Sequence, residues 1–350
     1  MAFSLGRRRG KRSAYAERLS RMTAPLPDPA GTRDLLRFAT LAASGHNTQP
    51  WRFRSRAEGV DILPDLERRT PVVDPDDHHL WASLGCAAET LAIAARARGL
   101  SAEVRFATEG GEEAIAVDLA PGGARPAEEA DLFAAIPQRQ STRGLYDGRP
   151  LPAPVVERMT AEAARVGVDL LWLPRGPRVD EVLALVLAGN AAQMGDRAFV
   201  AELKSWLRFD AAQAARDNDG LYAAAAGSPT LPPWLGRRMF DLVFRAGPEN
   251  DKVARQIRSS AGLLVLVAPT NDPAGWAAAG RAYSRVALAA TAAGARLAFV
   301  NQCVEVPEQR AALRGLLGLG ERRPNLVLRV GFAPAMPRSL RRPVEEVLAG

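Results

Sequence analysis

The sequence is poor in the residues that most often carry protein chemistry. It has two cysteines, Cys86 and Cys303, and three histidines among 350 residues. Two cysteines exclude a disulfide framework and favour a reducing, cytoplasmic location. Aromatic residues make up 6% of the chain, and no apolar run approaches the length that a membrane-spanning helix requires. We therefore expect a soluble cytoplasmic protein without a membrane segment.

Several common catalytic and nucleotide-binding motifs are also missing. No G-x-G-x-x-G lies between a strand and a helix, and "GLLGLG" at Gly315–Gly320 has the wrong spacing and closes a helix. No G-x-S-x-G and no H-E-x-x-H occur. His78 and His79 begin a helix next to aspartates, without a cysteine or a third histidine near them in sequence. We predict no metal site there.

The positive charge is unevenly distributed. The net charge is +7, but residues 1–21 hold seven Lys and Arg against one acid, which leaves 39 basic and 38 acidic residues in the remainder. Such a basic tail is usually solvated. We predict a disordered tail over residues 1–30 and a nearly neutral body that does not bind nucleic acid.

Hydrophobic periodicity predicts a mixture of helices and strands. Trp51 and Phe53 alternate with arginines ahead of Val60 and Ile62, which indicates a hairpin. The strands do not alternate regularly with helices, which argues against a doubly wound parallel sheet. Helical spacing predicts helices over 32–43, from about 76, and over 152–166, 179–210, 276–293 and 308–317.

The chain divides at the linker "APGGARPAEE", so we expect one unit over 31–127 and a second over 128–350. Residues 215–250 are rich in glycine, proline and aromatics, and a long insertion of this kind is more often a lid than a passive connection. The aromatic residues of this region either cover a site or pack in the core. The candidates for covering a site are Trp206, Phe209, Tyr222, Trp234 and Phe240.

Two polar turns and the end of the chain together resemble a known family. The turn "SGHNTQPWRF" (Ser44–Phe53) is similar to the Ser–x–x–Asn–x–Gln–Pro–Trp turn of the FMN-dependent nitroreductases. "RQSTRGLYDGRPLP" (139–152) resembles the Arg–x–Ser–x–Arg/Lys turn of that family. "LVLRVGF…SLRRPVEEVL" resembles its last strand and the basic residue before a proline. "NQCVEVPEQR" is similar to a segment of the Acg-type subfamily.

The order of the motifs differs from that of ordinary family members, where the Arg–x–Ser turn comes first. Here the amide turn lies in the first unit and the Arg–x–Ser turn in the second. The resemblance thus implies an α+β fold of two fused nitroreductase-like halves that arose by gene duplication. These halves would form an intramolecular pseudo-dimer with one composite FMN site, and the sequence leaves further oligomerisation open.

The resemblance also implies which residues hold FMN, although a solvated cluster of surface arginines is the alternative reading. It places Arg139, Ser141 and Arg341 at the phosphate, with Arg342 as a helper, and Arg143 at the pyrimidine edge of the flavin. The remaining contacts would come from Ser44, Gly45, Asn47, Gln49, Phe299, Asn301 and Gln302.

In this family the flavin carries the chemistry, so we predict no catalytic side chain. NAD(P)H would be the electron donor, and a small molecule such as a nitroaromatic or a quinone would be the acceptor. The alternative is an FMN-sequestering protein with little reductase activity, in which Trp206, Tyr222 and Trp234 of the lid region close the site.

Overall fold

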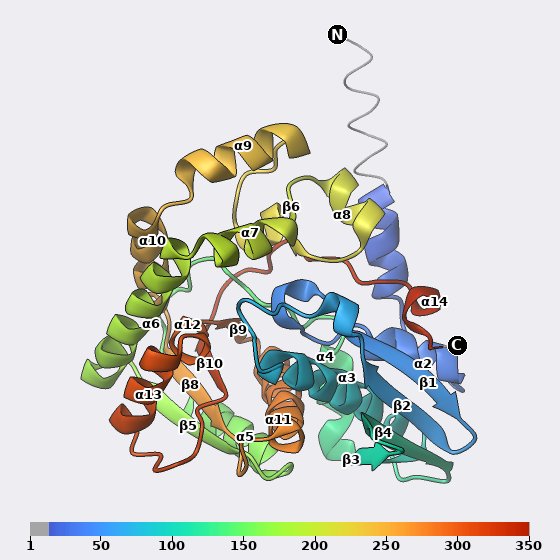
Figure 1. Ribbon diagram of the computed structural model, residues 1–350. Helices are drawn as coiled ribbons and strands as arrows, with labels where there is room; N and C mark the ends of the chain where they lie inside the picture. Colours follow the sequence, from blue (N-terminus) through green and yellow to red (C-terminus); the bar gives the residue numbers. More distant parts are fainter. Residues whose placement is uncertain (1–13, 350) are drawn as a thin grey trace.

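The computed structural model describes residues 14–349 and contains two four-stranded antiparallel sheets (Figure 1). The first sheet has the order β1-β2-β4-β3. Its outer pair is the expected hairpin, in which the apolar side chains of Trp51 and Phe53 are buried and Arg52 between them is exposed. The strands of this sheet are β1 (Trp51–Arg56), β2 (Gly59–Pro64), β3 (Leu100–Glu109) and β4 (Glu112–Pro121).

The second sheet has the order β5-β8-β10-β9, and its two central strands consist mainly of buried aliphatic residues. Its strands are β5 (Asp169–Pro174), β8 (Gly262–Val267), β9 (Arg296–Phe299) and β10 (Leu326–Gly331). Both sheets share one topology: the long helix follows the second strand, and the third strand takes the outer edge beyond the fourth. The expectation of an α+β fold with two similar halves is confirmed.

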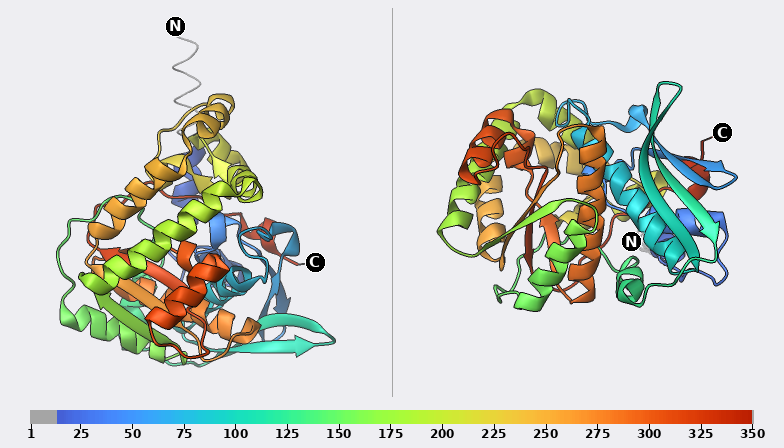
Figure 2. Two further views of the ribbon diagram at one scale, coloured as in Figure 1. Left: turned by 60° about the vertical axis from the view of Figure 1, so that its left-hand side comes forward. Right: turned by 90° about the horizontal axis from the view of Figure 1, so that it is seen from below.

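The two long helices, α3 (His78–Arg96) and α11 (Pro273–Ala292), pack against each other at the centre of the molecule (Figures 1 and 2). Their contact is reciprocal. A Cβ on Gly85 would clash with the carbonyl oxygen of Ala277, and a Cβ on Gly280 would clash with that of Ala82. Each helix therefore presents an Ala–x–x–Gly step to the other, and glycine is required because the backbones approach so closely.

A buried ionic cluster joins the same helices to the second half. The Arg285 guanidinium on α11 lies 2.7 Å from carboxylate oxygens of Glu89, Glu129 and Glu162. All four side chains are buried. Removing a single partner would leave an uncompensated buried charge, so this cluster fixes how the helices meet.

The remaining helices surround the sheets, and α7, α8 and α9 form a roof on one side (Figure 1). Asp196 separates α6 from α7 and caps α7 by accepting a hydrogen bond from the Ala198 amide at 2.8 Å, which breaks the single helix that we expected over 179–210. The helices are α2 (Thr32–Ala39), α4 (Ala130–Ala135), α5 (Ala153–Ala164), α6 (Pro177–Gly195), α7 (Arg197–Ser205), α8 (Ala211–Asp217), α9 (Pro233–Val243), α10 (Ala246–Arg258), α12 (Gln302–Glu305), α13 (Pro307–Leu316) and α14 (Val344–Val347). Two short parallel strands, β6 (Leu207–Arg208) and β7 (Leu221–Tyr222), pair within the roof.

Both ends of the described segment, residues 14–349, are tied to the body. Residues 14–22 are helical, which corrects the prediction of a disordered tail through residue 30. Apolar side chains hold this segment in place, because Leu26 is buried and the ring of Tyr15 lies 5.2 Å from that of Tyr222. The arginines at positions 7–12 lie outside the described residues. At the other end, Leu348 pairs with Phe53 beside the first sheet.

No helix among residues 14–349 has both the length and the apolar character that crossing a membrane demands.

Candidate functional site

A cavity of about 480 Å³ is lined by both halves of the molecule and by the roof. A smaller cavity of about 70 Å³ adjoins it, and Ser44 and Arg143 line both. Of the residues that the sequence singled out, the first half contributes Ser44, Gly45 and His46 to the larger cavity, and the second half contributes Arg143, Phe299, Asn301 and Gln302. The two polar motifs, far apart in sequence, therefore meet at one site.

The smaller cavity is rich in arginine. Arg139, Ser141 and Arg341 line it as the sequence suggested, and so does Arg338, which sequence reasoning missed. The spacing of Arg338 and Arg341, three residues apart before a proline, was the available signal.

These arginines point their guanidinium groups at backbone carbonyls instead of carboxylates. Arg139 donates to the carbonyl oxygen of Leu41 at 2.9 Å, and Arg341 donates to that of Ala42 at 3.1 Å. Over residues 14–349, neither these two nor Arg143 and Arg338 form an ion pair. A cluster of buried and half-buried cations without acids is a site for an anion.

The electrostatics of the cluster agree with that reading. Burial, together with the charges of Arg139 and Arg338, lowers the pKa of Arg341 to about 9. Burial likewise lowers the pKa of Arg338 to about 10, with Arg139 and Arg296 adding to the shift. An anion bound among these groups would relieve their mutual repulsion.

The turn that begins at Ser44 has an unusual backbone. His46, Asn47 and Gln49 have φ angles of 46°, 57° and 54°, in the left-handed region that non-glycine residues avoid. The Ser44 hydroxyl accepts a hydrogen bond from the Gln49 amide at 3.0 Å and helps to hold this shape. Clustered backbone strain of this kind is typical of functional sites.

His46 faces the larger cavity as a neutral ring. Burial lowers its pKa to about 4, and the neighbouring charges of Arg143 and His79 contribute. Its Nδ1 atom is buried and has no hydrogen-bond partner in the described part of the chain. An unpaired buried nitrogen at a cavity wall is available to a ligand.

Both amide side chains of the turn donate hydrogen bonds to the segment after α8, and only Asn47 also lines a cavity. Asn47 lines the smaller cavity, and its Nδ2 donates to the carbonyl oxygens of Gly220 and Leu340, each at 3.0 Å. Gln49 lines neither cavity, because its amide is fully buried and donates to the Asn218 carbonyl at 2.9 Å. The structure therefore places Gln49 behind the turn, away from the expected ligand contact.

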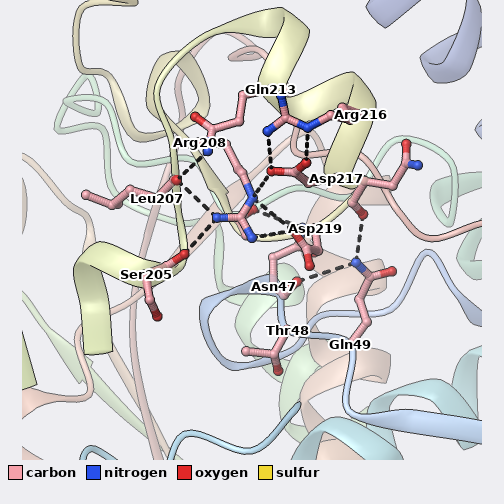
Figure 3. A network of polar contacts seen from close by, with 12 residues as sticks. Asn47, Thr48, Gln49, Ser205, Leu207, Arg208, Gln213, Arg216, Asp217 and Asp219 are labelled. Atoms are coloured by element: carbon pink, nitrogen blue, oxygen red, sulfur yellow. Dashed lines mark hydrogen bonds and ion pairs between the residues drawn. The ribbon is translucent and has the colours of Figure 1, made fainter. Parts of the chain in front are cut away.

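An ionic cluster strengthens this connection, as Figure 3 shows. Asp219 pairs with Arg208, whose Nη2 lies 2.6 Å from Oδ1, and also with Arg68. Arg68 donates in addition to the carbonyl oxygen of Thr48 at 2.6 Å. We call residues 217–221, with these partners, the roof clamp, because they fasten the roof to the Ser44–Phe53 turn.

The segment after β9 forms the opposite wall. The ring of Phe299 lies 4.6 Å from that of Tyr283. The strand ends at Phe299, so Asn301 and Gln302 lie at the start of α12. Asn301 Oδ1 accepts from the Val327 amide at 2.9 Å, whereas Gln302 Oε1 is buried without a partner among residues 14–349.

The roof covers the cavity, and of the five aromatic residues that we proposed only Phe209 and Phe240 line it. Trp234 is 65% exposed, Trp206 packs on the guanidinium of Arg68, and Tyr222 packs on Tyr15; none of the three lines the cavity. The apolar residues in and beside the roof that line the cavity include Phe199, Leu203, Leu207, Phe209, Leu221, Leu231, Met239, Phe240 and Phe244.

One group of side chains has the composition of a metal site. The ligand atoms of Asp74, His78 and His79 lie within 4.8 Å of one another. However, the two Asp74 oxygens each accept a backbone amide of α3 at 2.9 Å, and His78 Nε2 lies 3.2 Å from the Asn325 amide nitrogen. These contacts already occupy the atoms that would bind a metal, because they hold the start of α3 in place. We therefore assign no metal to this group.

Known proteins resemble this chain over most of its length. No family model matches it. It is 30% identical over 342 residues to the "Putative NAD(P)H nitroreductase Rv3131" of Mycobacterium tuberculosis, which covers 93% of each chain. It is 26% identical over 335 residues to the "Putative NAD(P)H nitroreductase acg" of the same organism, which covers 92% of this chain and 97% of that one.

The chain is also similar to solved structures, among them the FMN-dependent nitroreductase NfnB from Mycobacterium smegmatis in complex with NADPH. That match has 13% sequence identity and a TM-score of 0.39, and it covers 59% of this chain and 93% of that one. The level and extent of identity to the first relative place the protein in a family. The chain belongs to the NAD(P)H nitroreductases, a family of oxidoreductases.

Proposed function

We propose that the protein is an FMN-dependent oxidoreductase that uses NAD(P)H to reduce nitroaromatics or quinones by two electrons. The observation that carries this proposal is the arginine cluster, which has no carboxylate partner within residues 14–349 and opens into a larger, mostly apolar cavity. A ligand that suits both cavities is a dianion at one end and an apolar ring at the other. FMN has this form.

The residues present fit FMN. Arg139, Arg338 and Arg341 would hold the phosphate with Ser141, because guanidinium groups bind phosphate oxygens in a fixed fork. Ser44 and Asn47 face the same small cavity from the first half and would contact the ribityl chain. The two cavities meet at Arg143, so this residue would lie where the chain of FMN joins its ring.

The ring would lie in the larger cavity. Phe299 offers it an apolar face, and the buried Gln302 Oε1 and His46 Nδ1 offer two polar atoms that lack partners in the described part of the chain. Gly45 leaves room for close approach of the backbone, since its nearest contact to an added Cβ is 3.9 Å away. The wall is thus mostly apolar with a few directed polar atoms, as cofactor sites are.

When bound, FMN would accept two electrons from NAD(P)H and pass them to the acceptor. The chain supplies binding and electrostatics. Burial lowers the pKa of Arg143, and no carboxylate among residues 14–349 pairs with it, so its charge is free to stabilise negative charge that develops on the ligand. The apolar roof excludes water, which strengthens that interaction.

The site is composite in this proposal, with one FMN for each chain. Its support is that residues of both halves line both cavities, and that the halves share one strand order and a reciprocal Ala–x–x–Gly contact. A gene duplication followed by fusion accounts for this symmetry. The fused halves would form an intramolecular pseudo-dimer, to which further oligomerisation would add nothing essential.

The roof clamp favours a second candidate, an FMN-sequestering protein with little turnover. Asp219, Arg68 and the amides of Asn47 and Gln49 fasten the roof directly to the proposed flavin turn. A roof held so firmly would hinder the approach of a bulky nicotinamide. The two candidates differ in reactivity and not in cofactor.

An absorption spectrum followed by anaerobic NADPH addition tests both. A yellow protein that bleaches and recovers its colour with a quinone establishes the reductase. A yellow protein that only dithionite bleaches supports sequestration. A colourless protein that takes up no added FMN contradicts the proposal.

We further propose a cytoplasmic location and no nucleic-acid partner. Both cysteines are free and buried, which suits a reducing compartment. The positive charge is concentrated in residues 1–21. Salt-dependent binding of DNA or RNA by a chain that lacks residues 1–13 would contradict the second statement.

A further inference from the structure

An acid–base pair lies on the cavity wall and has no part in holding FMN. Glu305 on α12 and His79 at the start of α3 both line the larger cavity, and Glu305 Oε1 lies 3.5 Å from His79 Nε2. The side chains are only 19% and 12% exposed. The pair joins the two halves, since α3 belongs to the first and α12 to the second.

The position of Glu305 directs it toward the reacting end of the cavity. Glu305 follows Gln302 by three residues on α12, which puts both side chains on one face of the helix. Gln302 and Glu305 both line the cavity, on the wall that Phe299 begins. Glu305 is therefore near the proposed ring site and away from the arginine cluster, which lines the smaller cavity.

The surroundings of Glu305 favour a carboxylic acid. Gln193 Nε2 donates to Oε2 at 2.6 Å, which leaves Oε1 for a proton. Burial raises the pKa of the carboxyl, and the nearby Asp74 raises it further, against the opposite effects of His79 and Gln193. Cys303, the other titratable neighbour, is a buried thiol whose pKa is raised to about 12, so it stays neutral.

Two other imidazole rings, those of His78 and His46, lie near His79. The ring centroid of His79 lies 4.6 Å from that of His78. The ring of His46 lines the same cavity and feels the charges of both His79 and Arg143. His46 and His78 are each held neutral by burial, which lowers the pKa of both. His79 is thus the member of this group that faces a carboxyl partner.

We propose that Glu305 is the proton donor to the oxygen of the bound acceptor, and that His79 returns the proton to Glu305 after each turnover. This inference rests on the proposed function and names a side chain with a chemical role where the sequence suggested none. A donor of this kind is needed because the products of nitro and quinone reduction carry more protons than the substrates.

The step balances for a quinone. Transfer of a hydride, two electrons and one proton, converts the quinone to a hydroquinone monoanion. The O–H bond of Glu305 breaks, its proton bonds to the anionic oxygen, and the neutral hydroquinone leaves. The Glu305 carboxylate then takes a proton from His79, which is reprotonated from solvent. NAD(P)H supplies the hydride equivalent, as in the proposed function.

The test compares two acceptors on the same reduced protein. Benzoquinone needs protons, whereas ferricyanide takes single electrons and needs none. In stopped-flow reoxidation of the flavin-containing protein, Glu305→Gln should slow the reaction with benzoquinone by roughly 100-fold, the usual contribution of a general acid. Its reaction with ferricyanide should stay within about twofold of wild type. His79→Gln should slow benzoquinone alone, to a smaller extent.

A matched control and a readout that needs no flavin complete the design. Glu308→Gln changes an exposed carboxylate only three residues along the chain from Glu305, one that lines neither cavity, and should leave both reactions unchanged. In the flavin-free protein at neutral pH, the infrared band of a protonated carboxyl should be present in wild type and in Glu308→Gln, and lost in Glu305→Gln.

The outcomes separate this inference from the proposed function. Wild-type protein that takes up no FMN contradicts the proposed function. Flavin-containing Glu305→Gln that reacts with benzoquinone at the wild-type rate overturns the proton donor alone. Equal slowing with both acceptors also overturns it, since that result indicates a general disturbance of the cavity. An unchanged carboxyl band in Glu305→Gln would show that Glu305 is ionised and cannot donate.

Discussion

Replacing Arg341 by methionine should abolish tight FMN binding while leaving the ligand-free fold almost as stable as before. Arg341 is a half-buried cation that donates to the carbonyl oxygens of Ala42, Ser339 and Leu340. Its pKa, about 9 instead of 12.5, corresponds to an unfavourable ~5 kcal/mol for keeping the charge in the fold at neutral pH. The unfolded chain holds this proton more tightly, so the penalty is present below pH 9 and is relieved as pH rises above it.

The opposing contribution is of similar size. Arg341→Met also removes four hydrogen bonds to carbonyls, each worth about 0.5–1.5 kcal/mol. The two effects nearly cancel, and we expect the free energy of unfolding without FMN to change by less than about 2 kcal/mol. Loss of a buried contact between guanidinium and phosphate costs about 3 kcal/mol, so the Kd for FMN should rise roughly 150-fold.

Arg342→Met is the matched control. Arg342 is the adjacent residue, but it lines neither cavity and faces Asp65 at 3.5 Å and Glu346 at 3.8 Å. Flavin fluorescence titration gives the Kd, and urea denaturation with and without FMN gives the stabilities. Tight FMN binding by Arg341→Met, or an equal loss in Arg342→Met, would refute the assignment of the arginine cluster to the phosphate.

Three further perturbations test the fold, the turn and the roof. Gly280→Ala should destabilise the protein by roughly 3 kcal/mol or more in urea denaturation because its Cβ meets a backbone carbonyl, whereas Gly315→Ala on α13, with open space around it, should be neutral or stabilising; equal effects would contradict the close helix contact. His46 has a pKa of about 4 in the fold and 6.5 when unfolded, so the unfolded chain takes up the proton first as pH falls, and wild type should lose about 2–3 kcal/mol more stability than His46→Gln between pH 7 and pH 4.5; parallel pH profiles would show that the ring is not held neutral. Asp219→Asn removes the acid shared by Arg68 and Arg208, so amide hydrogen exchange should accelerate over residues 205–222 but not in the sheets; unchanged exchange in the roof would mean that the clamp does not hold it.

The elements that repeat a simple pattern could be predicted from the sequence. The hairpin at β1 and β2 follows from alternating side chains, and α3 and α11 follow from long helical spacing. The break at Asp196 was missed, because apolar spacing continues through it and only the cap of the side chain on the Ala198 amide reveals a new helix. Local capping competes with periodicity, and periodicity alone does not detect it.

The meeting of the polar motifs at one cavity could be predicted in outline from the sequence. Arg139, Ser141, Arg143 and Arg341 meet as the motifs suggested. The insertion predicted over 215–250 includes α9 but neither α7 nor most of α8, and Trp234 within it is exposed to solvent. The side of a helix that faces a cavity depends on how the helix packs against the rest of the protein. The local sequence of α9 does not predict that packing.

Sequence reasoning also missed what the second half of the turn does. The Gln49 side chain holds the roof by donating to the Asn218 carbonyl, which lies 169 residues further along the sequence. A contact at such a separation exists only in the folded molecule. Glu305 was missed for a related reason: it becomes conspicuous only when His79, from the other half, lies beside it.

The reciprocal contact between α3 and α11 has a consequence for how the site responds to dilution. Where two separate chains build a site, its occupancy falls once the protein concentration drops below the dissociation constant of the dimer. Here both walls belong to one chain, so their effective concentration is set by the covalent connection and does not depend on the amount of protein. The affinity for FMN should therefore be the same at nanomolar and at micromolar protein, which lets the cell keep the site intact at very low copy number.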